Sequence, residues 1–238
     1  MEITPTKTVR ELAVEVPGST RLFEKLGIDY CCGGAVSLET ACAVAGLSAE
    51  TVVSSLEQVE QERAEAGEFN ETSLTALISY ILEKHHGFTR QELDRLEPLL
   101  DKVCSVYREN HPELQRIQTL FRQLKSELMP HMQKEEAILF PYISELEDVV
   151  SRSALRAKPF FGTVRNPIRM MMIEHDAAGD LLREMRDLSS GFSIPEGACV
   201  SFQTLYRDLE ALERDLHQHI HLENNILFPR AIDMESAA

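Results

Sequence analysis

Residues 131–141 read HMQKEEAILFP, and residues 219–229 read HIHLENNILFP. Both stretches begin with a histidine, place a glutamate four positions later and end in Ile-Leu-Phe-Pro. Residues four positions apart lie on the same face of an α-helix, so each histidine shares a face with its glutamate. The pattern occurs twice at an offset of 88 positions, from His131 to His219. This offset indicates an internal duplication.

The duplication extends along both helices. Apolar residues recur at steps of three and four on either side of each His-x3-Glu pair, which is the pattern of a helix face that points into a bundle. Each His-x3-Glu pair is therefore predicted to occupy core positions. The first stripe contains Ile117, Phe121, Leu124, Leu128, His131, Glu135, Ile138 and Tyr142. The second contains Leu205, Leu209, Leu212, Leu216, His219, Glu223, Ile226 and Arg230.

A second pair of helices repeats at an offset of 89 positions, from His86 to His175. Leu82, His86, Thr89, Leu93 and Leu96 correspond to Met171, His175, Ala178, Leu182 and Met185. Each half thus holds one inward histidine and, one helical hairpin later, one His-x3-Glu pair. We expect an all-α fold in which an antiparallel four-helix bundle brings four imidazoles and two carboxylates to one level. The four helices are predicted at about 72–107, 112–146, 167–191 and 197–232.

Glycine and proline divide the N-terminal part of the chain into short apolar-periodic runs. Ser19 is a predicted N-cap and Gly27 a predicted helix end, because these residue types prefer those positions. Two further runs follow, and the sequence CCGG stands at residues 31–34. Residues 60–70 are polar and charged. We therefore predict a small helical domain over residues 1–68 and the bundle over residues 69–238.

Composition narrows the function classes. The 238 residues carry a net charge of −15 and a pI near 5.0. That charge repels phosphate, so a nucleic-acid partner is not expected. Every long apolar stretch contains Asp, Glu or Arg, and no basic-then-apolar signal peptide opens the sequence. A membrane partner is therefore not expected either.

The cysteine content favours a reducing, cytoplasmic environment. Five is an odd number, and the spacing is not that of a disulfide scaffold. Cys42, Cys104 and Cys199 are most simply small apolar residues on helices. The cysteines are Cys31, Cys32, Cys42, Cys104 and Cys199.

Two interpretations of the inward-facing polar residues compete. A lone histidine on an apolar face is more often a hydrogen-bonded core residue than a ligand. A buried carboxylate without a partner, however, costs roughly several kcal/mol. Apart from Arg230, no lysine or arginine occupies an adjacent stripe position to neutralise Glu135 and Glu223. A metal would supply the missing charge, and the sequence therefore predicts a metal site.

The donor set suits a pair of metal ions. A glutamate can bridge two ions through its two oxygens, while the imidazoles divide two per ion. Nitrogen and oxygen donors with open positions favour iron or manganese, whereas structural zinc prefers a closed tetrahedral site. The spacing differs from the Glu-x-x-His motif of ferritin-like bundles. His217 and His221, two residues either side of His219, are expected on the flank or surface.

These residues resemble a known family. HMQKEEAILFP, HIHLENNILFP and EHDAAGDLL at residues 174–182 resemble the hemerythrin-like superfamily. With GIDYCCGG at residues 27–34, they closely resemble the repair-of-iron-centres family of bacterial di-iron proteins, over nearly the whole chain. The resemblance implies two non-haem iron ions joined by carboxylate and oxo bridges. The ligands it implies are His86, His131, Glu135, His175, His219 and Glu223.

The resemblance also implies a function. The family is linked to the repair of iron–sulfur clusters damaged by nitric oxide or peroxide, through the supply of iron. Oxygen-carrying hemerythrins have a fifth histidine that is not evident here, which argues against oxygen carriage. We expect a stress-response protein whose partners are damaged iron–sulfur proteins. An enzyme that reduces nitric oxide or peroxide and a redox or gas sensor stay open as alternatives, as does a homodimer.

Cys31 and Cys32 have two interpretations. Adjacent cysteines form a disulfide only with strained geometry. Beside Gly33-Gly34 their thiolates could ligate iron or attack nitrosylated sulfur. They could instead be reduced thiols that pack a small domain. The residues alone leave both open, and the resemblance favours the functional role.

Overall fold

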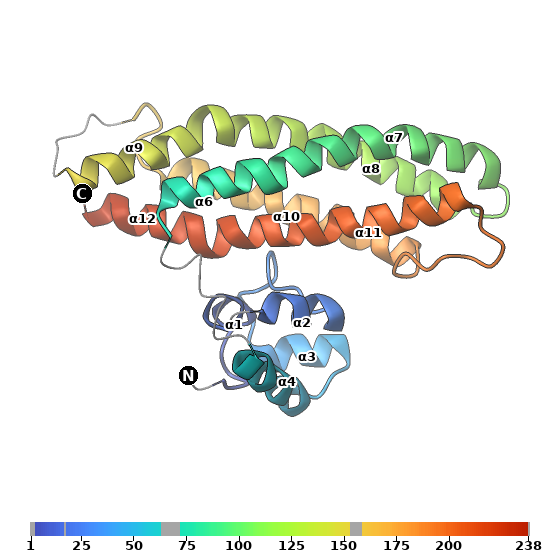
Figure 1. Cartoon of the computed structure of the whole chain (residues 1–238), viewed down its shortest axis with the longest axis horizontal. Coiled ribbons are helices and arrows are strands. Elements are labelled where there is room, and N and C mark those ends of the chain that lie inside the picture. Colours follow the sequence, from blue (N-terminus) through green and yellow to red (C-terminus); the bar gives the residue numbers. More distant parts are fainter. Residues whose placement is uncertain (1–2, 17, 63–71, 153–158, 238) are drawn as a thin grey trace.

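The protein is built from helices. The computed structural model places a small group of short N-terminal helices against the middle of a long four-helix bundle (Figure 1). This arrangement confirms the predicted all-α class, and the described residues contain no strand. The described residues are 3–16, 18–62, 72–152 and 159–237, with no side-chain description for 60–62.

The N-terminal helices pack around a core of their own that includes Phe23, Leu38 and Leu56. Gly27, at a φ of +67°, ends the second helix as predicted. Ser19 is not the N-cap. Gly18 takes that position, because Ser19 is fully buried and its hydroxyl donates to the carbonyl of Leu12 at 3.1 Å. The helices are α1 (Val9–Glu15), α2 (Ser19–Leu26), α3 (Leu38–Ala45) and α4 (Ala49–Glu62).

Four long rods form the bundle, close to the predicted ranges. The α7 segment packs on α8 and α11, and α8 packs on α10. Three rods contain a π-helical turn, labelled η. The rods are α6 (Leu74–Ile81), η1 (Leu82–His86) and α7 (Gly87–Tyr107); α8 (Glu113–Lys134), η2 (Glu135–Leu139) and α9 (Phe140–Ser151); α10 (Arg165–Leu188); and α11 (Val200–His221), η3 (Leu222–Leu227) and α12 (Phe228–Ala237).

The π-turns change which residues face the core. A π-turn holds an extra residue compared with an α-turn, so the helix face that follows is rotated. Ile138, predicted on the buried stripe, is 39% exposed, and its neighbour Leu139 is 1% exposed. The prediction for Ile138 was wrong because the stripe was extended with unbroken α-helical periodicity through η2.

Two apolar clusters in the bundle leave a polar level between them. One cluster lies around Leu93, Phe121 and Leu209, towards the end of the bundle where α7 and α8 meet. The other lies around Ile81 and Ile143, towards α9 and α12. Apolar packing therefore isolates the polar level from both ends of the bundle.

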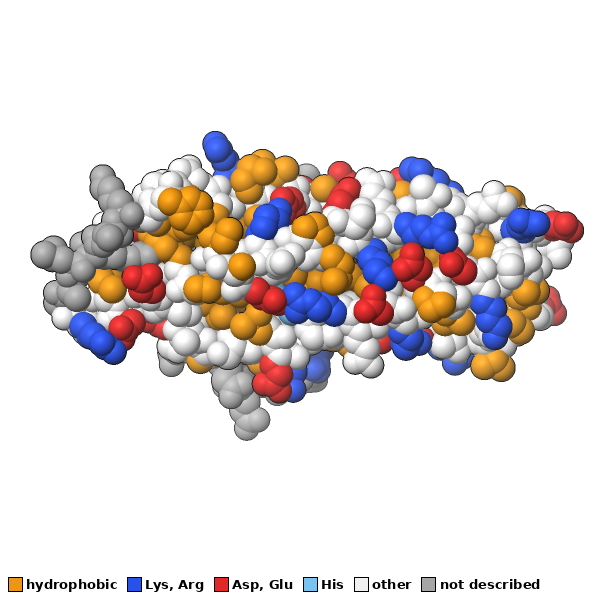
Figure 2. Space-filling view, turned by 90° about the horizontal axis from the view of Figure 1, so that it is seen from above, with side chains coloured by type: hydrophobic (Ala, Val, Ile, Leu, Met, Phe, Trp, Pro, Cys, Tyr) orange, Lys and Arg blue, Asp and Glu red, His pale blue; other side chains and the backbone are white. Residues whose placement is uncertain are grey.

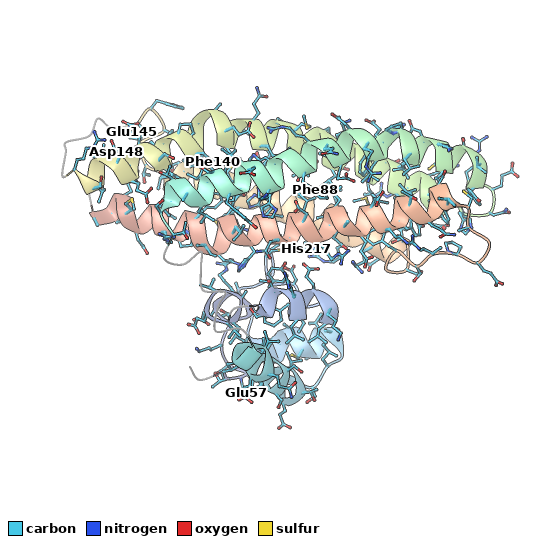
Figure 3. The ribbon with its side chains drawn as sticks, viewed as in Figure 1. Glu57, Phe88, Phe140, Glu145, Asp148 and His217 are labelled. Carbon is cyan, nitrogen blue, oxygen red and sulfur yellow. The ribbon has the colours of Figure 1, made fainter. Side chains whose placement is uncertain are left out.

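The N-terminal helices contact the bundle through polar groups. The Nδ2 of Asn225 in η3 donates to the carbonyl of Tyr30 at 3.0 Å. Nδ1 of His217 lies 3.1 Å from Oε1 of Glu24, and Figure 3 shows His217 pointing from the bundle towards the N-terminal helices. These contacts seat the CCGG segment against the bundle.

Part of the predicted organisation falls outside the described residues. The boundary predicted near residue 68 lies there. None of the described helices is long and apolar enough to span a bilayer. The face shown in Figure 2 carries acidic, basic and apolar groups interspersed.

Candidate metal centre

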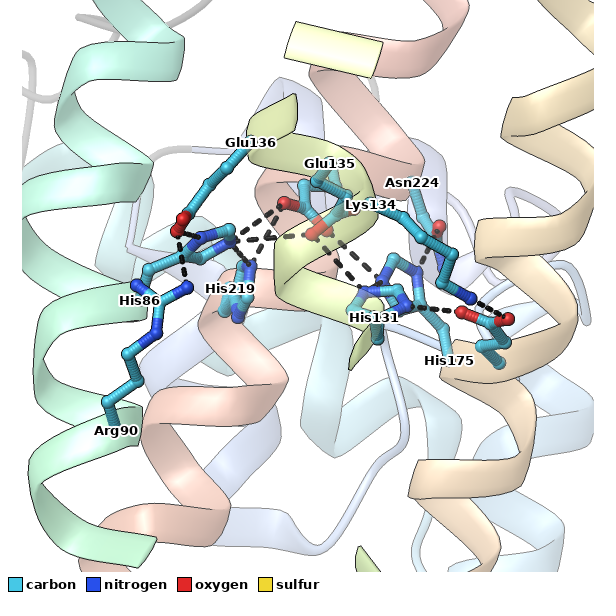
Figure 4. Close-up of polar contacts among 11 residues, drawn as sticks. His86, Arg90, His131, Lys134, Glu135, Glu136, His175, His219 and Asn224 are labelled. Atoms are coloured by element: carbon cyan, nitrogen blue, oxygen red, sulfur yellow. Dashed lines mark hydrogen bonds and ion pairs between the residues drawn. The ribbon is translucent and has the colours of Figure 1, made fainter. Parts of the chain in front are cut away.

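Six polar side chains meet at the polar level of the bundle, drawn from all four rods (Figure 4). Three of them, His86, Glu135 and Glu223, lie in the π-turns. Each is at most 1% exposed. They are His86 in η1, His131 in α8, Glu135 in η2, His175 in α10, His219 in α11 and Glu223 in η3.

The six side chains form two groups that share both glutamates. Within each group the ligand-type atoms all lie within 4.8 Å of one another. Two buried groups with shared carboxylates are consistent with a di-metal site. One group is His86, His219, Glu135 and Glu223, and the other is His131, His175, Glu135 and Glu223.

Glu223 connects the two groups through its two oxygens. Its Oε1 lies 2.9 Å from Nε2 of His219, and its Oε2 lies 3.1 Å from Nε2 of His175. One carboxylate oxygen therefore faces each group, which is the arrangement a bridging carboxylate needs. Glu135 faces both groups through Oε2, at 3.3 Å from His131 and 3.4 Å from His86.

The imidazoles meet in pairs through their Nε2 atoms. The Nε2–Nε2 distance is 3.0 Å between His131 and His175 and 3.1 Å between His86 and His219. Two ligands at right angles on one ion, each with a bond of about 2.1 Å, lie about 3 Å apart. The separation within each pair is thus the one that two neighbouring ligands of a single ion have.

Acceptors behind three of the rings direct Nε2 towards the centre. A carboxylate accepts only, so it takes the N–H of Nδ1 and leaves a lone pair on Nε2. Arg90 and Lys134 in turn pair with the two carboxylates among these acceptors. The contacts are His86 Nδ1 to Glu136 at 2.7 Å, His131 Nδ1 to Glu174 at 2.8 Å and His175 Nδ1 to Oδ1 of Asn224 at 2.9 Å.

The centre is unbalanced without a cation. Both oxygens of Glu135 and Oε2 of Glu223 are buried without a hydrogen-bond partner among the described residues. Nε2 of His131 and Nε2 of His175 lie 3.0 Å apart, so without a metal one ring must place a proton between them. Burial acts to lower the pKa of His175, but Glu223 outweighs it and raises that pKa to about 9. Unpaired buried acceptors such as these carboxylate oxygens are costly. A metal ion would satisfy the carboxylates and the two Nε2 atoms together, so the residues fit a metal.

The pKa values of the side chains at this level are shifted by burial and by their charged neighbours. Burial and the neighbouring Glu223 raise the pKa of Glu135 to about 7. Burial acts to lower the pKa of His86, but Glu135 and Glu223 outweigh it and raise that pKa to about 10. For His131, burial and His175 lower the pKa to about 4. A cation therefore competes with protons for this site, and acid pH opposes its binding.

Comparison with known proteins shows which domains these residues belong to. The model of the hemerythrin HHE cation binding domain matches residues 77–231, and that of ScdA_N, a domain of unknown function (DUF542), matches residues 5–60. Iron-sulfur cluster repair protein ScdA of Staphylococcus haemolyticus is 34% identical over 230 residues, which cover 95% of this chain and 98% of the relative. The chain belongs to the iron–sulfur cluster repair protein family with a hemerythrin HHE domain.

Other relatives of this repair family cover similar lengths. Iron-sulfur cluster repair protein YtfE of Pectobacterium carotovorum is 33% identical over 95% of this chain and 96% of the relative. A probable iron-sulfur cluster repair protein of Haemophilus influenzae is 33% identical over 94% of this chain and 95% of the relative. The predicted family resemblance is thereby confirmed over both the N-terminal helices and the bundle.

In this member of the repair family, the CCGG segment lies against the rod that carries His175. The backbone N–H groups of Cys31 and Cys32 donate to Oδ1 of Asp29, at 3.1 and 3.0 Å. The thiol of Cys32 lies 3.5 Å from the carbonyl oxygen of His175. A hydrogen bond from Cys31 lowers the pKa of Cys32, and the same contact, with burial, raises the pKa of Cys31. A thiol role for the pair stays a prediction.

Three acceptors behind the predicted ligands were not predicted from the sequence: Glu136, Glu174 and Asn224. Each of these residues is the chain neighbour of a predicted ligand, so a search for acceptors beside the ligand positions would have found them. His221 was predicted on the flank or surface, and this was wrong because the N-terminal helices cover it. It is 3% exposed, and its Nδ1 lies 2.8 Å from Nδ2 of Asn225.

Proposed function

We propose that the protein holds two non-haem iron ions and supplies iron to damaged iron–sulfur clusters. The observation that carries the proposal is the pair of buried histidine groups that share Glu135 and Glu223, in a chain of the iron–sulfur cluster repair family. The ligands on this proposal are the four histidines and two glutamates predicted from the sequence. An oxo bridge and a cytoplasmic location are part of the proposal.

The donor chemistry favours iron. Imidazole and carboxylate donors that leave coordination positions open suit iron or manganese more than zinc. Each group offers two imidazoles and the two shared glutamates. When bound, two irons would supply a redox pair that can change between ferrous and ferric states. The surrounding residues orient the rings and exclude bulk water.

The ion in the His86–His219 group would be bound less firmly than the ion in the His131–His175 group, which supports iron donation. Nδ1 of His219 has no hydrogen-bond partner among the described residues, whereas Nδ1 of His131 and of His175 each have one. An acceptor behind a ligating ring strengthens metal binding about 10- to 100-fold. The ion held by the His86–His219 group is therefore the one we propose is given up.

Iron transfer tests the proposal. The iron-loaded protein is mixed with an iron–sulfur protein that lacks part of its cluster, and the recovery of cluster absorbance is followed. We expect recovery with the native chain and none with the Glu135→Leu/Glu223→Leu variant. Recovery that is equal with both proteins, or absent with both, would reject iron donation.

A second candidate is an enzyme that reduces nitric oxide at the same centre. The open positions that the donor set leaves to small ligands favour this alternative. Stoichiometric nitrous oxide from a single turnover of the diferrous protein would support the enzyme. Absence of nitrous oxide together with iron transfer would support repair. A partner that binds only one oxidation state would instead indicate a sensor.

A further inference from the structure

A large cleft opens between α2 of the N-terminal helices and the bundle. Its volume is about 810 Å³, which lies within the range of small-molecule sites. Thr20, Arg21 and Lys25 on α2 form one wall. Phe88 of α7, labelled in Figure 3, belongs to the bundle wall. The cleft is therefore built jointly by the two parts of the molecule.

The unpaired charges of this cleft are positive. Arg21, Lys25 and Arg214 line it, and none of the three has an ion pair within the described ranges. Each of the three lining acids contacts a neighbouring side chain. Glu210 lies 3.9 Å from Arg186, which also lines the cleft. Glu24 accepts from the hydroxyl of Tyr30 at 2.8 Å, and Asp215 contacts His85. The lining therefore holds four cationic side chains against three carboxylates, and the three cations without an ion pair can contact an anion.

His85 adds a buried polar atom to the wall of the cleft. The residue is 4% exposed, and its Nδ1 lies 3.0 Å from Oδ1 of Asp215. The carboxylate takes the Nδ1 proton, which leaves a lone pair on Nε2. That Nε2 is buried and has no hydrogen-bond partner among the residues described. It needs a donor, which a ligand can provide.

His85 also contacts the metal centre. Its ring is stacked on that of His219, with centroids 5.6 Å apart and planes 9° from parallel. A ligand that reaches His85 is thus one ring away from His219, whose Nδ1 has no hydrogen-bond partner among the described residues. The cleft and the centre share a wall.

We propose that this cleft binds a small anion that carries two or more carboxylates and one S–H or O–H donor. The carboxylates contact Arg21, Lys25 and Arg214, and the donor meets Nε2 of His85. Two chemical sources fit this description, an acidic thiol and a hydroxycarboxylate. The binding step stands apart from the proposed function, because it needs neither iron donation nor nitric oxide reduction.

Calorimetric titration of the metal-loaded, full-length protein tests the site. Reduced glutathione represents the acidic thiol and malate the hydroxycarboxylate. We expect one site per chain for at least one probe, with an affinity that falls as salt is added, because salt screens exposed charges. Binding of glutathione alone assigns the thiol source, and binding of malate alone assigns the hydroxycarboxylate. Binding of neither would overturn the proposal.

Three variants show whether the heat of binding comes from this cleft. Arg21→Ala/Arg214→Ala should weaken binding about tenfold, since two charge contacts are lost. Arg207→Ala is the matched control, because Arg207 is an exposed arginine on the same helix, α11, that does not line the cleft. His85→Phe keeps an aromatic ring and removes the Nε2 lone pair. It should abolish the preference for reduced glutathione over S-methylglutathione, which has no S–H.

The control results decide the case. Equal affinities in the Arg21→Ala/Arg214→Ala and Arg207→Ala variants would overturn the proposal, because the heat would then come from elsewhere. An unchanged preference for reduced glutathione in His85→Phe would overturn the contact with His85. Iron content measured in every variant shows whether the metal centre is intact, so loss of the centre is distinguished from loss of the cleft.

Discussion

Glu174 and His131 are joined by a hydrogen bond of 2.8 Å that connects α10 to α8 behind the candidate metal centre. Lys134 pairs with the other oxygen of Glu174. The carboxylate holds the proton on Nδ1 of His131 and directs Nε2 towards His175. A surface ion pair therefore fixes the tautomer and orientation of a fully buried ring.

Replacement of Glu174 by leucine should weaken metal binding. The ring of His131 would lose both its acceptor and its fixed orientation, so we expect metal affinity to fall about 10- to 100-fold. Competition with a coloured chelator measures the change. Glu184→Leu on the same helix is the control, because Glu184 pairs with the exposed Arg116 and lies away from the centre. Equal affinities in the two variants would contradict this role.

The rotated face after η2 gives a stability prediction. Leu139 is 1% exposed, so Leu139→Ala should lower the free energy of unfolding by about 2–5 kcal/mol. Ile138 is 39% exposed, so Ile138→Ala should cost about 1 kcal/mol or less. Urea unfolding of both variants measures the difference. A larger loss for Ile138→Ala would show that the helix continues without the π-turn.

Glu147 gives a pH-dependent prediction. Its carboxylate accepts from the backbone N–H groups of Leu74 at 2.7 Å and Thr75 at 2.9 Å, at the start of α6. Burial acts to raise the pKa of Glu147, but these N–H groups outweigh it and lower the pKa below 4.5. A lowered folded-state pKa means that the stabilisation is present above the unfolded-state pKa. It is lost as the pH falls through the folded-state pKa.

Glu147→Gln should therefore destabilise the protein most at neutral pH. We expect a loss of about 1 kcal/mol at pH 7, and a smaller loss below about pH 4. Urea unfolding at several pH values measures it. Glu109→Gln, at an exposed glutamate, should show no such trend. A loss for Glu147→Gln that grows as the pH falls would refute the assignment.

Gly179 lies under the CCGG segment. A Cβ placed on it would lie 3.0 Å from Sγ of Cys32, so Gly179→Val should displace that thiol from the bundle. We expect iodoacetamide to modify Cys32 several-fold faster, as read by mass spectrometry. Ala177→Val, at an exposed position on the same helix, is the control. Unchanged modification in Gly179→Val would mean that the segment does not rest on α10.

The polar centre could be predicted from the sequence because the same pattern occurs in both halves of the duplication. His131 and His219 lie on matching stripes, and each has a glutamate one turn later, so a chance match is improbable. The structure brings all six predicted residues together. Local periodicity and an internal repeat were sufficient for this part of the fold.

Contacts between distant segments could not be read in the same way. The exposure of Ile138 depends on an extra residue in a turn, which a periodicity count assumes to be absent. His221 is buried by helices near the other end of the chain. The hydroxyl of Ser19 donates to the carbonyl of Leu12 in α1 instead of capping α2. The burial of His221 and the contact of the Ser19 hydroxyl depend on tertiary packing, which overrides local preference.

Anomalous diffraction at the iron absorption edge, from crystals of the iron-loaded protein, tests the central claim most directly. We expect two strong peaks per chain, one beside Nε2 of His86 and His219 and one beside Nε2 of His131 and His175, with Glu135 and Glu223 adjacent to both. A single peak, no peak at this level of the bundle, or iron bound only at Cys31 and Cys32 would contradict the account.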